Sequence, residues 1–125
     1  MASFREGEDL DVAQRLLATD ETPTRHVCFL SQQSAEKALK AALVLEGTDF
    51  PYRHDLDALR NLLPDTWSIR RKHPDLAQLT EWAVEARYPG DWQEATAADG
   101  EQAVSQAQGV YDSIAAEFEQ RTNDE

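Results

Sequence analysis

Four basic residues in the middle of the chain have the charge and the spacing to bind a phosphate group. Lys37 and Lys40 stand three residues apart, which places them one turn apart on a helix. Arg53 and Arg87 follow later in the chain. An arginine offers a rigid fork of donors whose charge does not titrate at physiological pH. These four side chains could therefore form a mixed basic cleft for a phosphate.

Arg87 and its neighbour Tyr88 each have two interpretations. Arg87 ends a predicted helix, where it could bind a phosphate or be favoured by the helix dipole and pair with Asp91 or Glu85. Tyr88 could stack on a base or fill a groove between helices. Both are ligand-binding candidates, and Arg87 is also a candidate for a catalytic role.

His54 is the second catalytic candidate and also a ligand-binding candidate. A histidine that acts as a general base needs a partner and a substrate within reach. Asp55 or Asp57 could orient the ring, but no adjacent Ser or Cys offers itself as a nucleophile. The alternative, which we favour, is that His54 caps the helix that follows or packs under the connector Pro51–Tyr52.

Polar residues also interrupt the longest predicted helix. Glu36 and Lys40 stand four residues apart in the order that favours an intrahelical ion pair, worth about 0.3 kcal/mol. Gln32 and Gln33 occupy an otherwise apolar stretch, so they should hydrogen-bond across an interface or line a pocket, and we favour the interface. We expect Cys28, on the same helix, to be a small buried hydrophobe.

The remaining motifs argue against a metal site. The sequence has no P-loop, no GxGxxG, no His/Cys ligand set and no spaced acid pair of a known catalytic pattern. We expect no metal, and a nucleotide is the one cofactor we consider. The basic run Arg70–His73 could bind phosphate, but a solvated loop or a contact for an acidic partner is the better interpretation.

Charge is distributed unevenly along the chain. The net charge is −12, from 24 acidic and 12 basic residues. Residues 1–22 hold six acids and two bases, residues 91–125 hold nine acids and one base, and residues 23–90 hold nine of each. Because affinity for phosphate backbones comes largely from Lys and Arg, the net charge disfavours RNA as a ligand. An anionic ligand would have to meet the neutral middle segment.

The helical period recurs through the chain, and no stretch alternates as a strand would. We predict helices over about 9–19, 24–46, 55–63, 74–86 and 99–120. Gly47 should end the second helix, and Asp99 should cap the last. Leu56, Leu59, Leu62 and Leu63 should face inward, while residues 64–74 and 88–91 should form a loop and a turn. This predicts an all-α fold, a helical bundle.

Length and composition indicate one domain over residues 1–125, with its core at about 8–120. The longest apolar stretch has five residues, whereas a membrane-spanning helix needs about 20. The acidic N-terminus does not resemble a signal peptide. The single cysteine cannot form an intrachain disulfide, so we expect a reducing, cytoplasmic location.

Three segments resemble the signature blocks of the HEPN family (higher eukaryotes and prokaryotes nucleotide-binding domain). They are FLSQQSAEKALKAALVLEG, PYRHDLDAL and LTEWAVEARYPGD, in the expected order. The resemblance implies an up-and-down bundle of four to five helices, commonly a symmetric dimer. It also implies three modes of action: a toxin ribonuclease, a companion of a minimal nucleotidyltransferase, or a nucleotide-binding protein.

The ribonuclease mode depends on an Arg followed by four to six residues and a His near the start of the last helix. None of His26, His54 and His73 follows an Arg at that spacing. Arg87 is the only arginine near the expected place, and no His follows it. We therefore lean against a free-standing enzyme.

The leading interpretation is a HEPN-type binding or partner module, nucleotide- or phosphate-binding and paired with a minimal nucleotidyltransferase as in a toxin–antitoxin pair. Its site would lie around Lys37, His54, Arg87 and Tyr88. One alternative is a ribonuclease toxin with a non-standard site, using Arg87 and His54. Another is a homodimeric scaffold without a ligand, and a homodimer is expected in any case.

Overall fold

Every regular element in the described part of the chain is a helix. The computed structural model describes residues 11, 14–15, 24–50, 54–83 and 95–123. The labelled helices are α2 at Thr24–Leu45, α3 at Leu56–Asn61, α4 at Ile69–Lys72, α5 at Ala77–Thr80 and α6 at Ala97–Asn123. The predicted all-α bundle is confirmed. Of the helix predicted over 9–19, Asp11, Gln14 and Arg15 are helical, and its other positions lie outside the described residues.

Helix α2 ends at a glycine, as predicted. Gly47 has φ 67°, a left-handed conformation that costs a residue without Cβ little. Its N–H donates to the Val44 carbonyl at 3.0 Å, and the Thr48 N–H donates to the Leu43 carbonyl at 2.9 Å. This pair of bonds is a Schellman motif, and it satisfies carbonyls that the helix end would otherwise leave without partners.

Helix α6 begins earlier than predicted. The Thr96 hydroxyl accepts from the Asp99 N–H at 3.1 Å, and the Asp99 carboxylate accepts from the Thr96 N–H at 2.9 Å. These reciprocal bonds form a capping box, so Thr96 is the cap and Asp99 is the third helical residue. The prediction of Asp99 as the cap was therefore wrong by three positions.

The segment between the long helices is less regular than predicted. Asp55 caps α3 by accepting from the Ala58 N–H at 3.2 Å. The predicted loop over 64–74 contains α4, whereas α5 is shorter than the helix predicted over 74–86, of which residues 84–86 lie outside the described part. A helix that began at Pro74 would need the Ala77 N–H to donate to the His73 carbonyl. Instead the Ala77 N–H donates to Asp75 Oδ1 at 3.1 Å, and the His73 carbonyl accepts from Arg60 Nη1 at 2.8 Å.

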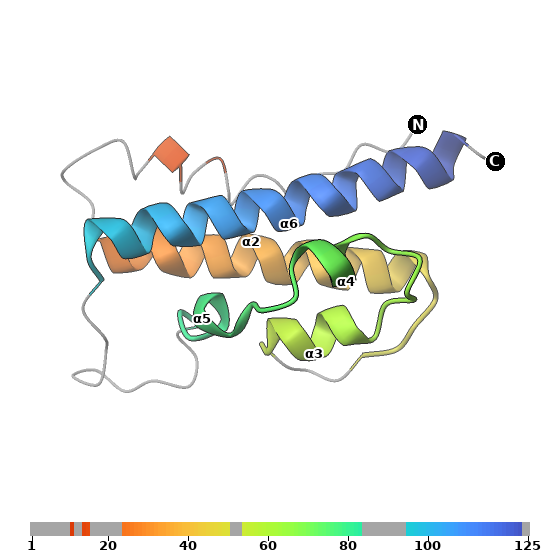
Figure 1. The fold of residues 1–125 in the computed structure, drawn as a ribbon, viewed down its shortest axis with the longest axis horizontal. Coiled ribbons are helices and arrows are strands. Elements are labelled where there is room, and N and C mark those ends of the chain that lie inside the picture. The colour runs from red at the N-terminus through yellow and green to blue at the C-terminus, as the bar shows by residue number, and fades with distance from the viewer. Residues whose placement is uncertain (1–10, 12–13, 16–23, 51–53, 84–94, 124–125) are drawn as a thin grey trace.

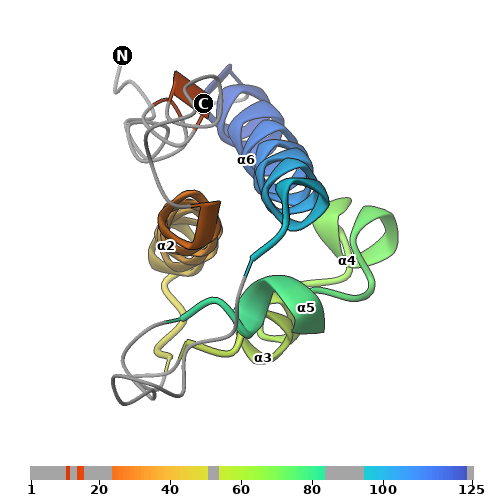
Figure 2. The ribbon, with the colours of Figure 1, turned by 90° about the vertical axis from the view of Figure 1, so that its left-hand side faces the viewer.

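The two long helices lie side by side and run in the same direction (Figures 1 and 2). Their C-terminal ends are joined by an ion pair from Arg121 on α6 to Glu46 beside α2, at 2.9 Å. The chain then returns from the C-terminal end of α2 to the N-terminal end of α6, and helices α3, α4 and α5 lie in this returning segment (Figure 1). The residues just before α3 lie against the middle of α2, where His54 contacts Gln32 and Glu36.

The core lies between the long pair and the short helices. Trp67, Ile69, Leu76 and Leu79 from the connecting segment are buried together with the small residues of α2 and the apolar stripe of α6. Three of the four leucines predicted to face inward are buried, whereas Leu62, the C-cap residue of α3, is 40% exposed. No helix in the described part of the chain is long and apolar enough to cross a membrane.

Candidate functional site

A buried carboxylate on α2 collects three polar partners. The Glu36 side chain is only 8% exposed. Its carboxylate accepts from Gln32 Nε2 at 2.9 Å and Lys40 Nζ at 3.0 Å, and His54 Nδ1 lies at 2.7 Å. Burial raises the pKa of Glu36, but the hydrogen bonds from these three side chains outweigh it and leave that pKa below its usual value. Gln32, Glu36, Lys40 and His54 are called the Glu36 cluster below.

His54 enters this cluster from the residues that precede α3. Its Nδ1 faces Glu36, 18 residues earlier in the chain. When the carboxylate is ionised it can only accept, so Nδ1 carries the proton of this bond. The prediction that His54 caps α3 was wrong, because Asp55 does so, and the connector Pro51–Tyr52 of the other interpretation lies outside the described residues. In the described contacts Glu36 orients the ring, whereas Asp55 accepts from the Ala58 N–H and Asp57 accepts from Arg60 and from the Leu76 N–H.

The glutamine pair belongs to the same network. Gln32 is fully buried, and its amide also lies 3.4 Å from the His54 carbonyl oxygen. Gln33 Nε2 donates to Gln32 Oε1 at 2.7 Å. The interface that we favoured for these residues is wrong for Gln32, because its side chain is fully buried within the chain and its described bonds go to α2 and to the residue before α3. The polar pair links α2 to the start of α3.

The predicted phosphate ligands are placed only in part. Lys40 pairs with Glu36 as its spacing predicted, and its Nζ lies 5.9 Å from the centre of the Phe50 ring. Lys37 is exposed on the same helix. Arg53, Arg87 and Tyr88 lie outside the described residues, so the four-residue basic cleft stays a prediction. The structure does bring Lys40 and His54 together, through Glu36.

This arrangement suits proton transfer or anion binding. A carboxylate on one nitrogen of an imidazole fixes the ring orientation and stabilises its protonated form. The Glu36 and Lys40 charges offset each other, so a proton on His54 would give the cluster one net positive charge. Among the described residues, no group of three or more His, Cys, Asp or Glu could hold a metal ion.

The basic run after Trp67 is divided between different roles. Arg70 bonds to Asp65 and to the Leu63 carbonyl, and the His73 ring packs against Gly109 of α6. Arg71 and Lys72 are exposed. Two of the four residues therefore hold α4 in place.

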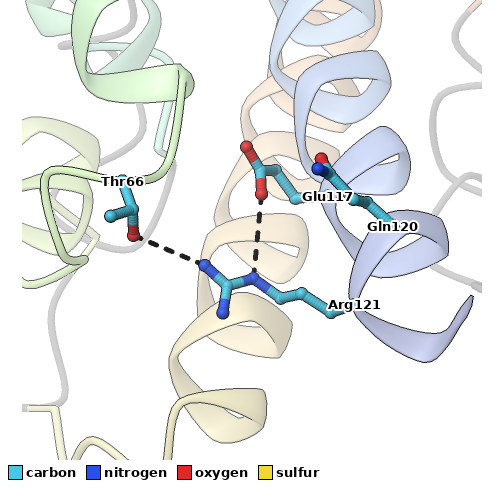
Figure 3. Close-up of a pocket in the computed structure, with 4 residues that line it drawn as sticks. All are labelled: Thr66, Glu117, Gln120 and Arg121. Atoms are coloured by element: carbon cyan, nitrogen blue, oxygen red, sulfur yellow. Dashed lines mark hydrogen bonds and ion pairs between the residues drawn. The ribbon is translucent and has the colours of Figure 1, made fainter. Parts of the chain in front are cut away.

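A polar hollow lies near the C-terminal ends of the long helices, away from the Glu36 cluster (Figure 3). It has a volume of about 370 Å³ and is lined by Thr66, Glu117, Gln120 and Arg121. The Arg121 guanidinium stacks 4.6 Å from the centre of the Trp67 ring and pairs with Glu46 at 2.9 Å and Glu117 at 3.7 Å. Since two carboxylates already surround its one cation, this hollow is a poor site for a phosphate.

Comparison with known proteins matches the HEPN domain family over residues 5–117. The chain belongs to the HEPN domain family. One relative of this HEPN protein comes from Methanocaldococcus jannaschii and is named "Putative toxin MJ1304". The two are 32% identical over an alignment of length 125, which covers 88% of this chain and 81% of the relative. No solved structure matches the chain.

The three HEPN-like blocks of the sequence meet around the start of α3. Gln32 and Glu36, in the first block, contact His54 in the second. Thr80, in the third, accepts from the Leu56 N–H at 3.1 Å and donates to the Leu76 carbonyl at 3.0 Å. The blocks are far apart in the sequence, yet their polar residues share one region of the HEPN fold.

Proposed function

We propose that this HEPN protein is the toxin-like member of a two-protein pair and that it binds a nucleotide or another phosphate-bearing ligand at the Glu36 cluster. The observation that carries the proposal is the placement of Lys40 and His54 on opposite sides of one buried carboxylate. The toxin-like role rests on the name of the Methanocaldococcus relative.

The chemistry of the cluster favours an anionic ligand. A protonated His54 would donate to a phosphate oxygen, and Lys37, exposed on the same helix, would add a second cation. Arg53, Arg87 and Tyr88 complete the proposed site, with Tyr88 stacking on a base. The rest of this acidic protein repels phosphate, which concentrates binding at the neutral middle segment.

Calorimetric titration with ATP tests this proposal. The wild-type chain should bind, and His54→Ala should weaken binding at least tenfold, while Lys72→Ala, which removes an exposed cation from α4, should leave the affinity unchanged. Equal losses in both variants would show that binding follows overall charge, and no binding by the wild type would reject the ligand proposal.

The proposed partner is a minimal nucleotidyltransferase, with a second copy of the chain completing a homodimer. The family resemblance supports both associations. Co-expression with such a nucleotidyltransferase should give a complex that survives size-exclusion chromatography. Sedimentation of the chain alone should give twice the mass of 14.1 kDa. A monomer at micromolar concentration would exclude the dimer.

A ribonuclease with a non-standard site is the second candidate, favoured by the 2.7 Å contact between Glu36 and His54. A carboxylate-oriented histidine can act as a general acid or base, and Arg87 would bind the scissile phosphate. Expression of the wild type should then arrest growth and degrade RNA, whereas His54→Ala and Arg87→Ala should do neither. Normal growth with the wild type would end this hypothesis.

A further inference from the structure

Gln32 contacts both halves of the Glu36–His54 pair. Its Nε2 donates to Glu36 Oε1 at 2.9 Å and lies 3.4 Å from the His54 carbonyl oxygen. One amide group thereby links the carboxylate on α2 to the backbone of the residue that carries the imidazole. Since the two residues stand 18 apart in sequence, local chain geometry does not set this separation.

The orientation of the Gln32 amide follows from its partners. Both a carboxylate and a carbonyl oxygen accept hydrogen bonds, so only the NH₂ end of the amide can face them. The oxygen end accepts from Gln33 Nε2 at 2.7 Å. The side chain is fully buried, and in the described structure each end of its amide has a partner. An amide held in this way is pre-organised and resists rotation.

Glu36 would have more freedom without this contact. Its Oε2 is held by Lys40, a flexible side chain from the next turn, whereas its Oε1 receives both Gln32 and His54. A ligand-binding histidine has to be held within a few tenths of an ångström by groups that are themselves held in place. Of the two described partners of Oε1, His54 is proposed to contact the ligand itself, whereas Gln32 contacts only Glu36 and the His54 backbone.

We propose that Gln32 is a positioning residue of the site: it fixes the Glu36 carboxylate and the His54 backbone relative to each other, so that the imidazole keeps one orientation toward the ligand. The importance of this role for binding rests on the proposed function, but the geometric role does not. The sequence alone offered an interface or the lining of a pocket for Gln32 and favoured the interface.

Nuclear magnetic resonance of the free protein tests the positioning role without a ligand. Gln32→Met keeps the length of the side chain and removes both donors. The ¹⁵N shifts of the His54 ring should report a proton held on Nδ1 in the wild type and a mixture of protonation forms in Gln32→Met. The control Gln108→Met removes an exposed amide on α6 and should leave the His54 signals unchanged. Identical His54 spectra in Gln32→Met and the wild type would overturn the proposal.

The wild-type protein supplies a second arm in case Gln32→Met does not fold. The side-chain amide protons of Gln32 should exchange with solvent at least tenfold more slowly than those of Gln108, because they are buried and bonded. Exchange at equal rates would also overturn the proposal. Titration with ATP then separates the two proposals: altered His54 spectra without any ATP binding by the wild type would reject the ligand and keep the positioning role.

Discussion

At the scale of single residues, Glu36 determines what the site can do. Its charge is held inside the fold by one cation, one imidazole and one amide, and these partners would lose a charged acceptor if the charge were removed. Unsatisfied buried donors are costly, so the cluster should contribute to stability as well as to binding.

Glu36→Gln should lower the free energy of unfolding by about 1–3 kcal/mol at neutral pH, the cost of leaving buried donors without a charged acceptor. Because folding lowers the pKa of Glu36, the unfolded state binds its proton more readily, and the stabilisation is lost as pH falls below the ordinary value of 4.5. Urea unfolding over this pH range measures the difference. Glu101→Gln, an exposed change on α6, is the control. If the difference in unfolding free energy between the wild type and Glu36→Gln did not shrink in acid, this assignment would be contradicted.

Cys28 should behave as an inert core residue. Burial first, and the charge of Asp99 second, raise the pKa of its thiol from 9.0 to about 11. We expect a disulfide reagent to modify the folded protein only as fast as it unfolds, with complete reaction in denaturant. Since the folded state keeps the thiol proton to higher pH than the unfolded state, the free energy of unfolding should decrease as pH rises from about 9 to about 11. Rapid labelling of the folded chain at neutral pH would show that the thiol is accessible.

Sequence reasoning found some of these residues and missed others for physical reasons. The Glu36–Lys40 pair follows from helical spacing alone, and the burial of Cys28 follows from its place on an apolar helix. The Glu36–His54 contact could not be predicted, because it depends on how the non-helical residues before α3 lie across α2. Gln32 was recognised as unusual, but its polarity alone cannot distinguish an interface from an internal network.

At the scale of elements, His73, the C-cap residue of α4, lies in close contact with Gly109 of α6. A Cβ added at Gly109 would lie 2.5 Å from His73 Cε1 and 2.9 Å from His73 Nε2. Glycine in a helix interior costs about 1 kcal/mol relative to alanine, so its presence in α6 needs a reason. The His73 ring, which occupies the space that a side chain would need, supplies that reason.

Gly109→Ala should destabilise the wild type by about 1–2 kcal/mol, because overpacking outweighs the gain in helix propensity. In a His73→Ala background the same change should stabilise the protein by up to ~1 kcal/mol, since the obstructing ring is gone. Thermal or urea unfolding of the four proteins gives this double-mutant cycle. The same sign in both backgrounds would mean that His73 does not occupy the space beside Gly109.

The same contact makes α4 sensitive to acid. Burial lowers the pKa of His73 below its usual 6.5, although a hydrogen bond to the Gly109 backbone opposes the shift. The unfolded state therefore gains a proton first as pH falls below 6.5, and stability should decrease there. His73→Gln should show a flatter dependence of unfolding free energy on pH between neutral and mildly acidic conditions. Equal slopes would exclude His73 as the titrating group.

At the scale of the whole molecule, the fold brings three polar sequence blocks together on one side of a parallel pair of long helices. Periodicity predicted the two long helices and the apolar stripe of α6, and Gly47 predicted the end of α2. The short helices could not be predicted, because a contact such as that of Arg60 with the His73 carbonyl replaces local hydrogen bonding only once the chain has folded. Residues far apart in sequence meet there, which is why the site emerged only with the fold.

The central claim is that the Glu36 cluster binds a phosphate-bearing ligand. The most direct measurement is a titration of the ¹⁵N-labelled protein with ATP, followed residue by residue. We predict saturable shifts centred on Glu36, Lys37, Lys40 and His54, with little change at Arg71 and Lys72 on α4 or around Thr66 and Arg121. Shifts confined to those distant residues, or none at millimolar ATP, would contradict it.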